Sequence, residues 1–155
     1  VLVSPGGFPN QYVSDEPVAP PPAMVAFLRT AAPAAVRTAL QGVYFDDAKI
    51  TQARVDLMSD MMRRRGNGEA FIDSINEFSL PDPTEDLARI AVPTLILWGE
   101  EDLVIPVAQA AMMEKAIPGA TLIRYAGVGH VPQEEEPAMT AADVKAFLAT
   151  LAAGS

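Results

Sequence analysis

Residues 94–98, with the sequence TLILW, decide the fold class of this 155-residue chain. The run is almost wholly apolar, follows a proline and stops at a glycine, which is typical of a strand buried on both faces. Residues 121–125 (TLIRY) predict a second strand, and residues 106–117 predict a helix between the two with proline at its first position. A closing helix is expected over residues 137–151. Strand, helix, strand and helix in this order predict an α/β fold built on a parallel sheet.

The N-terminal part of the chain has a different pattern. Residues 1–4 (VLVS) run into a Pro-Gly-Gly turn, which indicates the end of a further strand. Prolines and short helical patterns fill the stretch that follows, and Thr51 is expected to cap one of its helices. We therefore expect residues 1–7 and 84–155 to form the sheet, and residues 8–83 to form a helical insertion between two of its strands.

The composition excludes several classes of protein. Half of the residues are apolar, so wholesale disorder is excluded. There are 20 acidic and 11 basic residues, and the net charge of −9 argues against non-specific binding to nucleic acid or to an anionic membrane. The absence of cysteine excludes a disulfide framework, a thiolate metal site and a cysteine nucleophile. The sequence shows neither a membrane-length apolar run nor a basic and apolar leader, and we expect a cytoplasmic protein.

Two polar residues follow the predicted strands closely. Asp102 comes just after residues 94–98, and His130, the only histidine, comes just after residues 121–125. Ligands of parallel sheets bind beyond the carboxyl ends of the strands, and strands about 4.8 Å apart can bring such loops together. A carboxylate that accepts one imidazole N–H leaves the other ring nitrogen as a base near pH 7. The alternative for this pair is a surface histidine and an ordinary turn aspartate.

Both segments carry a family resemblance. Residues 90–106 (IAVPTLILWGEEDLVIP) resemble the acid-bearing strand and loop of the α/β-hydrolase superfamily. Residues 117–120 (IPGA) and 127–137 (GVGHVPQEEEP) resemble its last strand and its histidine loop, in family order and at similar spacing. The resemblance extends over the C-terminal part of such an enzyme, about three strands of the parallel sheet with an inserted helical cap. It implies that Asp102 is the acid and His130 the general base of a catalytic triad.

The nucleophile of the family has no counterpart in this sequence. The Gly-x-Ser-x-Gly elbow and the oxyanion loop are both absent, and we expect them to precede Val1. Ser4 is expected to end a strand rather than to act as a substitute nucleophile, because Pro5 follows it directly. Some relatives in the family carry the triad acid at the end of this earlier strand. Here Pro5, Gly6 and Gly7 follow Ser4 and none of them is a carboxylate, which favours Asp102 as the acid.

Three functional hypotheses follow from the resemblance. The first is a serine-type hydrolase of an ester or a related carbonyl compound, acting through an acyl-enzyme. The second keeps the fold but has an aspartate nucleophile, as in relatives that hydrolyse epoxides or remove halides. The third is a truncated or split chain without activity of its own.

Further residues complete the predicted site and its partners. Met62, Val104 and Val131 are expected to contact a small-molecule substrate, although ordinary helix packing is the alternative for Met62. Residues 134–136 (EEE) are expected to favour the N-terminus of the closing helix rather than to bind a metal, and no cofactor is expected. An unpaired strand edge at residues 1–3 predicts association with a missing N-terminal half or with a second copy.

Overall fold

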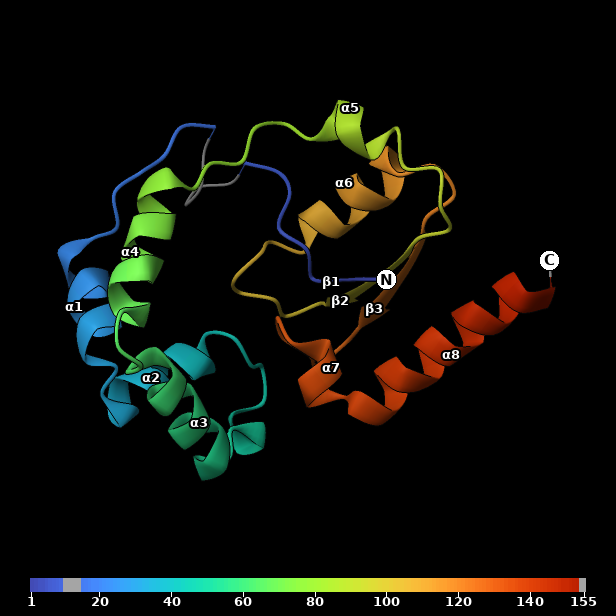
Figure 1. Cartoon of the computed structure of the whole chain (residues 1–155). Coiled ribbons are helices and arrows are strands. Elements are labelled where there is room, and N and C mark those ends of the chain that lie inside the picture. The colour runs from blue at the N-terminus through green and yellow to red at the C-terminus, as the bar shows by residue number, and fades with distance from the viewer. Residues whose placement is uncertain (10–14, 154–155) are drawn as a thin grey trace. The chain divides into compact units, whose positions relative to one another are not determined.

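The computed structural model describes residues 1–9 and 15–153, and divides the chain into two compact units (Figure 1). The sheet unit consists of Val1–Gly7, Val43–Asp46 and Pro83–Ser155, and the helical unit consists of Phe8–Gly42 and Asp47–Asp82. This division differs from the expected insertion over residues 8–83 mainly at Val43–Asp46. The reason is a set of hydrogen bonds, described below, that tie this short segment to the sheet unit.

The sheet unit is built on three parallel strands. They are β1 (Leu2–Val3), β2 (Leu95–Gly99) and β3 (Thr121–Tyr125), in the spatial order β1-β2-β3. Strands β2 and β3 pair along their whole length, from Leu95 opposite Thr121 to Gly99 opposite Tyr125. The predicted α/β class with a parallel sheet is therefore confirmed, with the predicted strand over residues 94–98 shifted by one residue.

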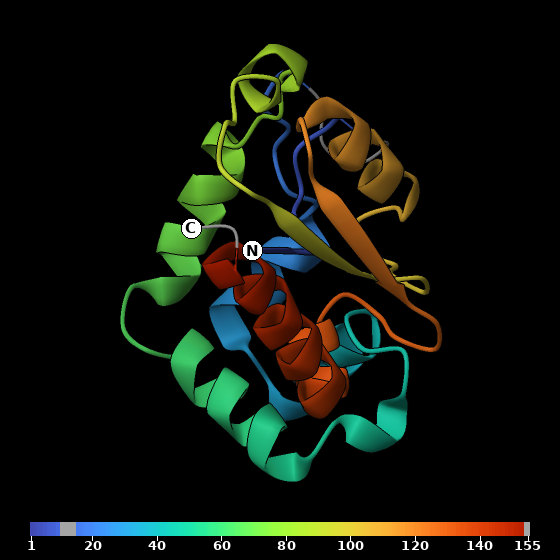
Figure 2. The same cartoon turned by 90° about the vertical axis from the view of Figure 1, so that its right-hand side faces the viewer.

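Helices cover the sheet within this unit. Those that contact the strands are α6 (Ala108–Ala116), α7 (Pro132–Glu135) and α8 (Pro137–Ala153), while the short helix α5 (Thr84–Leu87) packs against α6. Figures 1 and 2 show α6 and α8 on opposite faces of the strands. The prediction that Pro106 occupies the first position of α6 is wrong, because the helix begins at Ala108 with Val107 as its N-cap. The carbonyls of Pro106 and Val107 accept the amides of Gln109 and Ala110 in the first turn of the helix.

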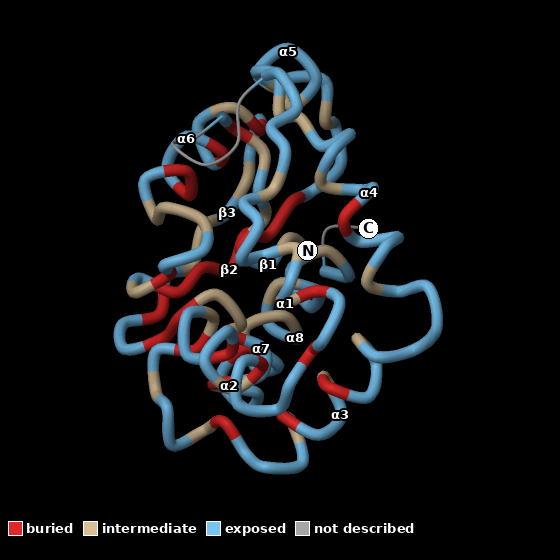
Figure 3. Tube along the Cα trace, turned by 90° about the vertical axis from the view of Figure 1, so that its left-hand side faces the viewer, coloured by how far each residue is buried: buried red, intermediate tan, exposed pale blue. Residues whose placement is uncertain are grey.

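Strand β2 lies at the centre of the core, and each of its residues is buried (Figure 3). Leu95 and Leu97 form a buried cluster with Tyr125 and Val128, against which α8 packs Val144 and Phe147. Because side chains alternate along a strand, Ile96 and Trp98 point to the opposite face, where α6 packs. The continuous apolar run is thus explained by burial on both faces.

The helical unit contains α1 (Pro22–Thr30), α2 (Pro33–Gln41), the short 3-10 helix η1 (Asp47–Lys49), α3 (Gln52–Met62) and α4 (Asn67–Glu77). Thr51 caps α3 as predicted, since its side chain accepts the amide of Arg54. Helix α1 packs against α4, and α2 packs against α3. Among the described residues of the whole chain, no helix combines the length and apolarity that a membrane span requires.

Candidate active site

The acid loop begins where β2 ends. The amides of Glu100 and Glu101 donate to the carbonyls of Tyr125 and Val128, so the loop continues alongside the chain that leaves β3. The side chain of Asp102 is fully shielded, at 0% exposure. Its Oδ1 accepts the amides of Val104 and Ile105, both at 2.8 Å. These two bonds fix the carboxylate and leave Oδ2 to face the neighbouring loop.

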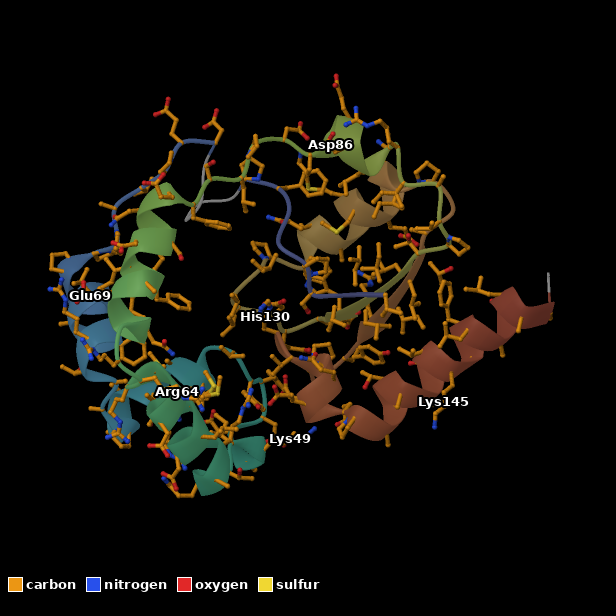
Figure 4. All side chains as sticks on the ribbon, viewed as in Figure 1. Lys49, Arg64, Glu69, Asp86, His130 and Lys145 are labelled. Carbon is orange, nitrogen blue, oxygen red and sulfur yellow. The ribbon has the colours of Figure 1, made fainter. Side chains whose placement is uncertain are left out.

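His130 lies on that neighbouring loop, between β3 and α7 (Figure 4). Its Nδ1 is 2.9 Å from Oδ2 of Asp102, and its side chain is 25% exposed. Because a carboxylate accepts hydrogen bonds, Nδ1 carries the proton and Nε2 is left with its lone pair. No hydrogen bond with the described residues occupies Nε2. The structure thus brings together the two residues that strand order predicted to meet.

Glycine makes this approach possible. A Cβ on Gly99 would lie 2.0 Å from the carbonyl oxygen of Gly129 and 2.3 Å from that of Val128. Gly127 has a φ of 72°, in the left-handed region that favours glycine, and it reverses the chain after β3. The sequence between Gly127 and His130 is therefore shaped for close packing of two loops against each other.

Three acceptors hold the backbone just before and at the histidine. The amide of Val128 donates to Glu101 Oε2 at 3.0 Å, that of Gly129 to Glu135 Oε1 at 2.7 Å, and that of His130 to the carbonyl of Val43 at 2.8 Å. Sequence reasoning did not identify Glu135 in this role, because three adjacent glutamates look alike before their burial is known. The prediction that all three serve the closing helix is wrong for Glu135, which lies in α7 and is buried.

The remaining predicted site residues divide between the units. Val104 and Val131 lie in the sheet unit. The amide of Val104 donates to Asp102 Oδ1, and Val131 directly follows His130 in the sequence. Met62 is the last residue of α3 in the helical unit, where it is half-buried. Met62 therefore belongs to a different unit from Val104 and Val131.

Ser4 lies at the carboxyl end of β1 and is buried. Its amide donates to the carbonyl of Leu97, and its φ of 39° is strained for a residue other than glycine. The hydroxyl is buried and makes no hydrogen bond with the described residues. No hydrogen bond links this hydroxyl to His130.

The arrangement has a defined chemical capacity. A shielded carboxylate that holds Nδ1–H fixes the tautomer of His130 and stabilises the imidazolium that forms when Nε2 takes up a proton. Nε2 is therefore a base for any hydroxyl or water that reaches it at about 2.6–3.2 Å.

Comparisons with known proteins show the family and the fold of the chain. The non-heme chloroperoxidase of Burkholderia pyrrocinia is 40% identical over 84 residues, which are 54% of this chain and 30% of that protein. Lipase 3 of Moraxella sp. (strain TA144) is 37% identical over 89 residues, 55% of this chain and 28% of the lipase. The fold resembles the crystal structure of a serine hydrolase from Cycloclasticus zankles, with a TM-score of 0.70 and 21% identity.

The extent of these matches is uneven. The structural match covers 97% of this chain but 54% of the Cycloclasticus protein, so the chain spans about half the length of that relative. The segments shared with the chloroperoxidase and the lipase are less than a third of either protein. Residues 1–143 match the model of the alpha/beta hydrolase family, and this chain is therefore a member of that family.

Proposed function

We propose that this chain carries the acid and the general base of a serine-type hydrolase that acts on an ester or a related carbonyl compound. The observation that carries the proposal is the 2.9 Å contact between Asp102 Oδ2 and His130 Nδ1, at the carboxyl ends of β2 and β3. In this reading Asp102 is the triad acid and His130 the base, as in the family. The lipase relative supports an ester-like substrate.

The proposed reaction follows the proton. Nε2 of His130 takes the proton of a serine hydroxyl while the serine oxygen attacks the carbonyl carbon, and Asp102 stabilises the resulting imidazolium. The imidazolium then gives the proton to the departing alcohol, which leaves an acyl-enzyme. A water molecule that loses its proton to Nε2 hydrolyses the acyl-enzyme and restores the serine.

The nucleophile in this proposal comes from outside these residues, since the 155-residue sequence holds no Gly-x-Ser-x-Gly elbow. We infer that the active molecule combines this chain with a segment that supplies the nucleophile and the oxyanion donors. Val104 and Val131 are proposed to contact the substrate beside the base, and Met62 is proposed as a further substrate contact.

The test is an assay of ester hydrolysis on the protein that includes the nucleophile segment. Replacement of the base by His130→Ala, or of the acid by Asp102→Asn, should lower kcat by on the order of 10⁴-fold. Circular dichroism of both variants checks that the fold is kept. An activity within about tenfold of the unmodified protein would rule out His130 as the base.

A second measurement identifies the nucleophile. A fluorophosphonate probe should label a serine in the active protein, and labelling should fall with His130→Ala. If the probe does not label the protein and ¹⁸O from water enters a carboxylate of the enzyme during turnover, the nucleophile is an aspartate and the serine mechanism is wrong.

A further inference from the structure

Glu135 is a buried carboxylate outside the pair formed by Asp102 and His130. It lies in α7 with 3% of its surface exposed, whereas the adjacent Glu134 is exposed. A buried carboxylate needs hydrogen-bond donors to offset the loss of water. Glu135 receives three from the backbone: Gly129 N at 2.7 Å on Oε1, and Phe45 N at 2.9 Å and Asp46 N at 3.3 Å on Oε2.

The donors come from two separate segments of the sheet unit. Gly129 belongs to the histidine loop, and Phe45 and Asp46 belong to the segment Val43–Asp46, which lies between α2 and η1 in sequence. A Cβ on Gly129 would lie 2.6 Å from Val43 O and 2.7 Å from Phe45 N, so the two segments are in direct contact. Glu135 therefore joins them with one oxygen on each.

The hydrogen bonds form a closed cycle that includes the backbone of His130. Glu135 holds Gly129 on one side and Phe45 on the other, and Val43 in turn accepts the amide of His130 at 2.8 Å. Tyr44 adds a bond from its hydroxyl to Glu134. Glu135 thus fixes Gly129 directly. It fixes the amide of His130 indirectly, because it holds the segment Val43–Asp46 whose Val43 carbonyl accepts that amide.

We propose that Glu135 is a positioning residue for His130. Its carboxylate fixes the backbone of the histidine loop, so that the imidazole stays in register with Asp102 and keeps its proton on Nδ1. The importance of this for catalysis rests on the proposed function, but the effect on the imidazole is a property of this chain alone. A displacement of about 1 Å in such a site costs on the order of 10²-fold in rate.

The single histidine allows a direct test in the 155-residue chain. Isotope labelling of histidine gives one set of imidazole signals, whose nitrogen shifts report which ring nitrogen carries the proton. The unmodified chain should show a slowly exchanging Nδ1–H in the neutral imidazole. Glu135→Gln places an amide NH₂ against backbone N–H donors, so this signal should be lost and the Nε2–H form should appear.

Matched variants separate positioning from a general loss of structure. Glu134→Gln makes the same chemical change one residue earlier, and its amide oxygen still accepts the hydroxyl of Tyr44, so the Nδ1–H signal should persist. Asp102→Asn should remove the signal directly. If Glu135→Gln keeps the Nδ1–H form, the proposal is overturned.

A measurement on the unmodified chain covers the case in which Glu135→Gln does not fold. Amide hydrogen exchange at Gly129, Phe45 and Asp46 should be as slow as exchange in the ladder between β2 and β3. Exchange at the rate of an exposed loop would overturn the proposal.

Activity gives a separate outcome. In the active protein, Glu135→Gln should lower kcat by about 10²-fold with little change in KM, because it displaces the base and not the substrate. If His130→Ala keeps its activity, the proposed function fails, while the imidazole spectra still decide the role of Glu135.

Discussion

Every residue of β2 is buried, whereas each α-helix of the helical unit buries only one or two residues. Helix α1 buries Leu28 alone, and α4 buries Ile72 alone. Short helices with so little buried surface depend on their neighbours for stability. We therefore expect the helical unit to open locally at a lower free energy than the sheet unit.

The difference matters for the candidate site. Asp102 and His130 both follow strands of the sheet unit, and the loops that carry them are tied by glutamate side chains and by backbone hydrogen bonds. A rigid scaffold holds reacting groups more accurately than a surface loop does. The sheet unit thus supplies the positional accuracy that the proposed general base, His130, requires.

The largest effect should come from Gly99→Ala in the sheet unit. The added Cβ would meet the carbonyl oxygens of Gly129 and Val128 at 2.0 and 2.3 Å, and backbone atoms cannot yield as flexible side chains do. We expect destabilisation beyond about 3 kcal/mol, or no folded sheet unit. Urea unfolding followed by circular dichroism measures this.

A matched glycine in the helical unit provides the control. Gly42 has a φ of −81° and its added Cβ would find the nearest atom at 3.4 Å, an ordinary contact. Gly42→Ala should therefore change stability by no more than about 1 kcal/mol. Equal effects of the two substitutions would contradict the difference in packing between the units.

The same substitution in each core sharpens the comparison. Leu97→Ala removes a side chain from the central strand and should cost about 3–5 kcal/mol, whereas Leu28→Ala in α1 should cost about 2–3 kcal/mol because the thinner core can collapse around it. Hydrogen exchange read by mass spectrometry should show faster exchange in β2 and β3 for the first variant. The second should affect α1 and α4, and a uniform change across the chain would argue against separate units.

Much of the sheet unit could be predicted from the sequence. The run of residues 94–98 has one physical explanation, burial on both faces, and it located β2 to within one residue. Strand order then placed Asp102 and His130 at one edge, because the carboxyl ends of parallel strands lie together. These inferences depend on local patterns and on the geometry common to all parallel sheets.

Other features depend on contacts between distant residues and left no local signal. Glu135 meets Phe45 from 90 positions away, so nothing in its immediate sequence distinguishes it from Glu134 or Glu136. The placement of Val43–Asp46 in the sheet unit follows from the same contact. The strained φ of Ser4 could not be read from the sequence either, because the residue before a proline normally adopts an extended conformation with a negative φ.

A moderate effect is expected for Tyr125, which links β3 to α8 through a 2.8 Å bond to Asp143. Burial, together with this hydrogen bond to a carboxylate, raises the pKa of Tyr125 well above its ordinary value. The phenol of the unfolded chain ionises near pH 10. The stabilisation that the protonated Tyr125 gives the folded state is therefore present below about pH 10 and is lost as the pH rises further.

Tyr125→Phe tests this dependence. At neutral pH the loss of the hydrogen bond should cost about 1 kcal/mol. Above about pH 10 the unmodified chain should lose urea resistance more steeply with rising pH than the variant, which has no phenol at this position to ionise. Parallel curves would show that the ionisation of Tyr125 is not coupled to unfolding.

The smallest effect is expected for Glu69→Gln in the helical unit. The carboxylate of Glu69 in α4 accepts hydrogen bonds from Nε and Nη2 of Arg29 in α1, at 2.7 and 3.1 Å. The side chains of Glu69 and Arg29 are 58% and 56% exposed, so water and salt screen the ion pair. The hydrogen bond from Arg29 lowers the pKa of Glu69, so its contribution is present above about pH 4.3 and is lost as the pH falls through the folded-state pKa. Glu69→Gln should lower the thermal midpoint of the helical unit slightly at neutral pH and leave it unchanged in acid. The control Glu77→Gln, on the same helix, should leave the midpoint unchanged at both pH values. A loss that persists in acid and in high salt would mean that Glu69 holds α1 against α4 by packing, and that the helical unit has a firmer core than its few buried residues indicate.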